Sequence, residues 1–127
     1  MHLVKTYCLP AVMYGCETWS FTAFSLKSLS LVWNNVFRKI FNACWRESPR
    51  SLQLYCVCLP ISFLLHQYRL IFWKRLITSN NTLLAVLAKL SQPQIVAFAS
   101  NYGIVQLLSC SVNCIKRHIL STISHTV

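Results

Sequence analysis

The scarcity of glycine restricts what this chain can fold into more than any other feature of its sequence. Only two glycines, Gly15 and Gly103, occur in 127 residues. Tight two-residue hairpin turns need residues that accept a positive φ, and glycine is the usual one. Few hairpins can therefore form, and the sequence predicts an all-α chain.

The clearest helical pattern lies at residues 23–44. Apolar side chains recur there at three- and four-residue spacing: Leu26, Leu29, Trp33, Val36, Phe37, Ile40, Phe41 and Cys44. Polar side chains fall on the opposite side of a helical wheel: Lys27, Asn34, Asn35, Arg38, Lys39 and Asn42. The pattern predicts an amphipathic helix with an apolar inner stripe and a basic, amide-rich outer face.

Two more helices are indicated in the middle of the chain. Ser48 can cap a short helix that starts at Pro49 and ends near Tyr55. Residues 61–77 then carry apolar side chains on nearly every face, so a helix there needs neighbours on both sides. In isolation such a helix exposes an apolar patch, which predicts self-association.

The two ends of the chain complete a single small domain of about six helices. Thr82 can cap a helix over 83–90, Pro93 begins another short segment, and a last helix is expected over 104–123. At the other end, Pro10 should kink or restart a helix within residues 2–19. That first segment is apolar from the outset and has no capping residue, which predicts a piece of a longer ancestral chain.

The charge of the chain excludes one broad class of chemistry. Twelve Lys and Arg face only Glu17 and Glu47, no Asp is present, and the net charge is +10. General acid/base pairs and two-metal phosphoryl transfer need at least two nearby acids. We therefore expect a non-enzyme without catalytic residues, whose field favours phosphate backbones or anionic lipid surfaces.

Basic residues interleaved with aromatic ones indicate where a nucleic acid would bind. Such a pattern suits contact with the sugar–phosphate backbone and stacking on bases. Trp33 and Phe37 lie on the apolar stripe and are expected in the core, whereas Trp45 remains a candidate for stacking. The basic candidates for non-specific binding of RNA or DNA are Arg38, Lys39, Arg46, Arg50, Lys74 and Arg75.

Several short motifs occur in a characteristic order. They are Tyr7-Cys8-Leu9-Pro10, Tyr14-Gly15-Cys16-Glu17-Thr18-Trp19, Trp33-Asn34-Asn35, Phe37-Arg38-Lys39-Ile40-Phe41, Trp45-Arg46-Glu47-Ser48, His66-Gln67-Tyr68-Arg69 and Phe72-Trp73-Lys74. In this order and spacing they resemble the segment that follows the catalytic palm in reverse transcriptases of non-LTR (LINE-type) retrotransposons. The resemblance covers roughly residues 3–80.

The resemblance implies a helical thumb or post-thumb region over residues 1–80, which in the full-length family protein helps to hold template and primer. Residues 81–127 carry no marker of the family and form a helical extension of unknown role. The metal-binding aspartates of the family lie upstream of this segment, so no catalytic residue carries over. The chain is interpreted as a non-catalytic remnant of a retrotransposon reverse transcriptase.

Seven cysteines cannot all pair within the chain, and most lie in apolar runs, which indicates reduced thiols and an intracellular protein. Cys56 and Cys58 are too close together for ordinary zinc spacing and are expected to pack in the core. Cys110, Cys114 and His118 share one face of the last predicted helix, and His125 is the nearby fourth candidate ligand. They are interpreted as an apolar helix face, with no metal or cofactor.

An alternative class of protein follows from the uncharged stretch between Lys89 and Lys116. It is long enough to span a bilayer, although Pro93, Asn101 and Gly103 interrupt it. A small basic membrane-associated protein that uses residues 90–115 is therefore the rival interpretation.

Overall fold

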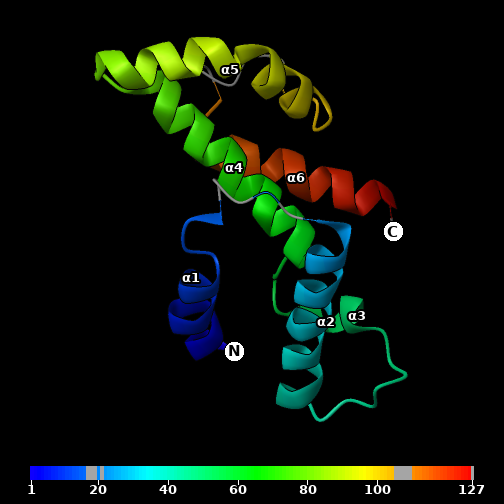
Figure 1. Ribbon diagram of the computed structural model, residues 1–127. Helices are drawn as coiled ribbons and strands as arrows, with labels where there is room; N and C mark the ends of the chain where they lie inside the picture. Colours follow the sequence, from blue (N-terminus) through cyan, green and yellow to red (C-terminus); the bar gives the residue numbers. More distant parts are fainter. Residues whose placement is uncertain (17–19, 21, 105–109, 127) are drawn as a thin grey trace. The chain divides into compact units, whose positions relative to one another are not determined.

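The computed structural model describes residues 1–16, 20, 22–104 and 110–126, and this part of the chain is helical without a strand (Figure 1). The expectation of a small all-α protein is confirmed. The helices follow one another along the chain as a π-helical turn η1 (Val4–Cys8), α1 (Leu9–Val12), α2 (Ala23–Ile40), α3 (Pro49–Tyr55), α4 (Ile61–Thr78), α5 (Thr82–Ser100) and α6 (Val112–Thr126).

The chain divides into two compact units, Met1–Leu65 and His66–Val127, with the boundary inside α4. This division follows packing, whereas the division at residue 80 follows the end of the family resemblance.

The N-terminal segment accommodates Pro10 by a change of helix type. The π-helical turn Val4–Cys8 precedes α1, and Pro10 is the second residue of that short helix. Helix α1 continues from η1 without a break, because the Leu9 N–H donates to the Val4 carbonyl. Pro10 has no N–H to donate and stands where the spacing of the helical hydrogen bonds changes. The expected restart of the helix at Pro10 therefore takes the form of a π-to-α transition.

Helix α2 begins as predicted and ends earlier than predicted. The Thr22 hydroxyl accepts a hydrogen bond from the Ser25 backbone N–H at 3.2 Å, which caps the helix. After Ile40, Asn42 adopts a φ of 51°, and the Ala43 N–H donates to the Arg38 carbonyl at 2.9 Å. Asn is among the few residues that accept the left-handed conformation, so the helix ends at Ile40 rather than at Cys44.

Trp33 and Phe37 form the centre of the first unit, as their place on the apolar stripe predicts. Both are buried, and their rings meet edge to face with centroids 5.1 Å apart. The Trp33 indole N–H donates to the Leu59 carbonyl at 3.1 Å, which ties α2 to the segment before α4. The buried Gln53 donates to the Asn34 side-chain oxygen at 2.8 Å, so α3 is tied to α2 as well.

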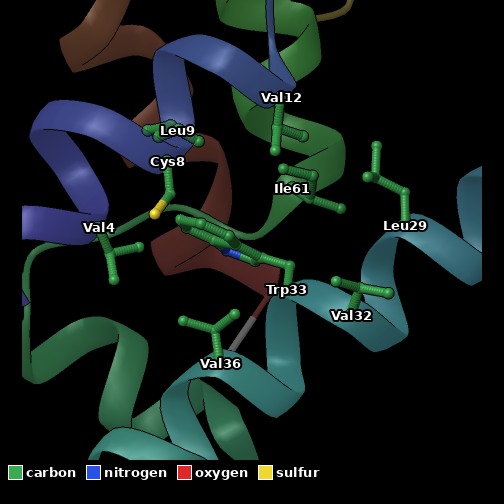
Figure 2. Close-up of a pocket in the computed structure, with 9 residues that line it drawn as sticks. All are labelled: Val4, Cys8, Leu9, Val12, Leu29, Val32, Trp33, Val36 and Ile61. Atoms are coloured by element: carbon green, nitrogen blue, oxygen red, sulfur yellow. The ribbon is translucent and has the colours of Figure 1, made fainter.

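An apolar cavity of about 70 Å³ lies beside Trp33. Figure 2 shows the indole between the N-terminal segment and α2. The residues that line the cavity are Val4, Cys8, Leu9, Val12, Leu29, Val32, Trp33, Val36 and Ile61. Ligand pockets usually enclose about 300–1,000 Å³, so this cavity is a packing defect that is too small for a nucleobase or a cofactor.

In the second unit, α6 buries one row of isoleucines, Ile115, Ile119 and Ile123, spaced one turn apart.

A second cluster of this unit is aromatic. Phe98 of α5 lies edge to face with His66 and Trp73 of α4, at centroid distances of 4.9 and 5.3 Å. Burial, together with the charge of Arg69, lowers the pKa of His66, so the imidazole in this cluster is neutral at pH 7.

Residues 61–74 of α4 are buried or half-buried. Two expectations about the helices that follow α4 are wrong. Helix α5 continues through Pro93 from an N-cap at Asn81, whose side chain accepts from the Leu83 N–H at 3.0 Å. The carbonyl that Pro93 leaves without a donor belongs to Lys89, which is exposed, so water can hydrate it.

The second concerns the start of the last helix, α6, which begins at Val112 rather than at 104. Gly103 adopts a φ of 70°, and the Ile104 N–H returns to the Ala99 carbonyl at 3.2 Å, which closes the end of α5. Ser111 caps α6, because its hydroxyl accepts from the Cys114 N–H at 3.1 Å. Residues 105–109 of the expected helix lie outside the described residues.

Replacing Trp33 should destabilise the first unit strongly. We expect Trp33→Ala to lower the free energy of unfolding by about 3–5 kcal/mol, because it enlarges an existing cavity. Trp33→Phe should cost about 1–3 kcal/mol, because the Leu59 carbonyl loses its donor. Phe24→Ala on the same helix is the matched control, since Phe24 is 80 % exposed. Urea unfolding followed by circular dichroism measures all three, and equal losses for Trp33→Ala and Phe24→Ala would contradict this account.

Candidate nucleic-acid interface

Four of the six predicted basic residues gather where α2 is joined to α3. Arg38 and Lys39 lie in the last turn of α2, Arg46 lies in the connection, and Arg50 lies in the first turn of α3. Arg38 fixes this arrangement, because its Nε and Nη2 both donate to the Glu47 carbonyl at 3.3 Å. The guanidinium thus holds the connection against the end of α2.

The remaining donors of this basic cluster are directed to solvent. The Arg38 Nη1 donates to the Asn35 side chain at 3.0 Å, and a guanidinium has five N–H groups, so Arg38 keeps donors for a phosphate. Lys39, Arg46 and Arg50 are exposed. Glu47 is the one acid within residues 38–50, and the segment retains a net charge of +3.

Exposed aromatic rings accompany the cations. Trp45 is 74 % exposed, and the Arg46 guanidinium lies 5.0 Å from its ring centroid. Tyr55, at the end of α3, is 82 % exposed and meets Phe41 edge to face with centroids 6.4 Å apart. A flat ring held at the surface beside cations offers a stacking platform for unpaired bases. The sequence indicated Trp45, but it did not indicate Phe41, which lies on the apolar stripe, or Tyr55.

Lys74 and Arg75 lie in the other unit and in different settings. Lys74 is half-buried, and its ammonium donates to the Cys110 carbonyl. This side chain supports the second unit from within. Arg75 is exposed. Four of the six predicted residues therefore form one cluster. Arg75 is exposed elsewhere, and Lys74 is bound to a backbone carbonyl.

The thiol of Cys58 shows no sign of activation. Cys56 and Cys58 were expected in the core, but both are only half-buried. The Lys5 ammonium donates to the Cys56 carbonyl at 2.6 Å. Burial raises the pKa of Cys58, and this outweighs the opposing effect of the Lys5 charge. The Cys58 thiol is therefore protonated at pH 7, whereas a nucleophilic cysteine needs a thiolate.

The second unit contains a group of metal-binding side chains. The ligand atoms of Cys110, Cys114 and His118 all lie within 4.8 Å of one another. Cys114 and His118 are on α6, whereas Cys110 precedes the Ser111 cap, so the expected single helical face is wrong. The side chain of His125 lies outside the described residues.

One helix among the described residues, Thr82–Ser100, is long and apolar enough to cross a membrane by length and composition alone. It differs from the stretch 90–115 that the sequence indicated, because α5 starts earlier and includes Lys89.

Comparison with known proteins adds no relative. No family model, no curated protein and no solved structure matches the chain.

Proposed function

We propose that this chain is a non-catalytic remnant of a LINE-type reverse transcriptase that binds the backbone of RNA or DNA without sequence specificity. The observation that carries the proposal is the basic cluster of Arg38, Lys39, Arg46 and Arg50 beside the exposed Trp45. Cations at this density attract phosphates, and the exposed rings favour single strands.

The composition of the cluster favours binding without sequence specificity. A sequence-specific protein recognises base edges with polar side chains that it holds in a fixed geometry inside a groove of the nucleic acid. Here, Arg46 and Arg50 extend from a connection and from the first turn of a short helix into solvent. Long, exposed cations suit phosphate contacts, which position a protein on a strand but do not specify its sequence.

The retrotransposon origin rests on the order of the aromatic and Asn-Asn motifs within residues 3–80. Two of these motifs take part in the interface. Phe37-Arg38-Lys39-Ile40-Phe41 supplies the end of α2, and Trp45-Arg46-Glu47-Ser48 supplies the connection and the cap of α3. A role in holding template and primer fits motifs that combine a buried anchor, Phe37, with exposed cations.

Binding to single-stranded RNA should weaken with salt in proportion to the phosphates contacted. For four contacts we expect log K to fall against log salt concentration with a slope of about −3, because each phosphate contributes about 0.7 on a single strand. Arg46→Gln/Arg50→Gln should flatten the slope by about 1 to 2 units and weaken all sequences alike. Fluorescence anisotropy with labelled RNA of several sequences measures both effects.

The matched control for this experiment is Lys27→Gln/Lys89→Gln, which removes the same charge at two exposed positions outside the cluster. Its slope should equal that of the original chain. An equal loss in the two double variants would mean that net charge alone drives binding, and strong preference for one sequence would contradict a backbone interface.

The purified chain should extend no primer. The family reaction needs aspartates that bind metal ions, and this chain has no Asp and only two Glu. With template, primer, deoxynucleotides and Mg²⁺ or Mn²⁺, incorporation should match a mock preparation. Sustained incorporation that copurifies with the chain would refute the non-catalytic assignment.

The second candidate function is attachment to a membrane surface through α5. Leu83, Leu87 and Leu90 recur at helical spacing and are exposed, Leu90 by 76 %. Lys89 lies in the middle of the helix, where a charge inside a bilayer is costly. Insertion of one face into the interface fits this pattern better than a transmembrane span. The same face is the place where copies of the chain would associate.

Neutral lipid vesicles distinguish the two functions. A chain anchored by α5 partitions into such vesicles in low and high salt alike, since apolar insertion is not screened. Leu83→Gln/Leu90→Gln should then weaken partition by about tenfold or more. Leu31→Gln/Leu54→Gln, at exposed positions of α2 and α3, should leave it unchanged. Salt-resistant vesicle binding without RNA binding would replace the nucleic-acid function by this one.

A further inference from the structure

A compact group of soft ligand atoms lies at the start of α6 and belongs to neither function above. The two thiol sulfurs of Cys110 and Cys114 and a ring nitrogen of His118 are all within 4.8 Å of one another. In a tetrahedral zinc site, bond lengths of about 2.0–2.3 Å place ligand atoms about 3.5–3.8 Å apart. The atoms must therefore approach one another by about an ångström to close around an ion.

The fold holds these side chains together by two hydrogen bonds and by the spacing of residues on α6. The Ser111 hydroxyl caps α6 through the Cys114 N–H at 3.1 Å, which fixes Cys110 immediately before the helix. The Lys74 ammonium of α4 donates to the Cys110 carbonyl and restrains this residue from the other side. Cys114 and His118 are one turn apart on α6, beside the buried Ile115 and Ile119. Restraint of the ligands before binding reduces the entropy that an ion must overcome.

The burial of the three residues leaves a path for an ion. Cys110 is buried, whereas Cys114 and His118 are half-exposed, so an ion can enter from the solvent side of α6. Burial and then the neighbouring Cys114 raise the pKa of the Cys110 thiol to about 11, while the Lys74 charge opposes this. Without an ion, the thiol of Cys110 is therefore protonated at neutral pH, and a bound ion releases that proton.

We infer that Cys110, Cys114 and His118 form a site for Zn²⁺ with three protein ligands. Two thiolates and one imidazole are a donor set that zinc prefers over harder ions such as Mg²⁺ or Ca²⁺. The fourth position is then taken by water or by a ligand from outside the group. The ion joins the residue before α6 to the first two turns of this helix and stabilises the second unit.

Cobalt(II) is the spectroscopic probe for this site. The reduced full-length chain is freed of metal with a chelator under anaerobic conditions and titrated with Co²⁺. We expect visible bands of tetrahedral cobalt and a thiolate-to-cobalt charge-transfer band, which saturate at about one ion per chain and disappear when Zn²⁺ is added. No such bands in the folded, reduced chain would overturn the inference.

Variants assign the ligands. Cys114→Ser and His118→Gln each remove one half-exposed ligand and should weaken Zn²⁺ binding by about tenfold or more. Cys56→Ser/Cys58→Ser, which removes the two half-buried thiols of the first unit, is the control and should bind like the original chain. Cobalt bands that survive in His118→Gln but vanish in Cys56→Ser/Cys58→Ser would place the ion elsewhere and refute the site.

Thermal unfolding gives a readout that does not depend on colour. Zn²⁺ should raise the melting temperature of the original chain and of Cys56→Ser/Cys58→Ser, because the ion binds the folded state. It should not raise the melting temperature of His118→Gln. Far-UV circular dichroism of each variant without metal shows that it is folded. An equal shift in all three proteins would mean that Zn²⁺ acts at another place and would overturn the inference.

Discussion

The indole of Trp33 is the interaction on which the first unit depends. It is buried against Phe37, lines the apolar cavity and donates its N–H to the Leu59 carbonyl at 3.1 Å. One side chain thus joins the middle of α2 to the chain that enters α4. Arg38 follows Trp33 by five residues, or about 7.5 Å along the helix axis, so the position of the basic cluster is set by how firmly Trp33 anchors α2.

The chain has only two acids, and among the described residues backbone carbonyls accept hydrogen bonds from several of its cations. Arg38 donates to the Glu47 carbonyl, Lys5 to the Cys56 carbonyl and Lys74 to the Cys110 carbonyl. Cys56 is the C-cap of α3, where carbonyls lack intrahelical donors and the helix dipole favours a positive charge. These contacts organise the fold but neutralise no charge. The net charge of +10 therefore still attracts anionic partners.

The sequence predicted the starts of the helices Ala23–Ile40, Pro49–Tyr55 and Ile61–Thr78 well. An apolar period marks the first, the Ser48 cap marks the second, and the third is a long apolar run. The prediction failed in the last third, because α5 runs through Pro93 and because the Ser111 cap lies within a long uncharged stretch in which polar and apolar helix faces cannot be told apart. The residue types of the basic cluster were also predictable. Its grouping was not, because the bond from Arg38 to a backbone carbonyl leaves no trace in the sequence.

The spacing of Cys110, Cys114 and His118 misled for a related reason. A repeat of four residues indicates one helical face, and a helical face of this kind is usually packing. In the structure, Ser111 caps the helix that begins at Val112, so Cys110 is outside it and its thiol lies near Cys114 and His118 of the first two turns of α6. Because the Ser111 cap lies between Cys110 and Cys114, the three side chains do not form a row along one helix face but approach one another. Capping residues decide both where a helix begins and which side chains before it can reach its surface.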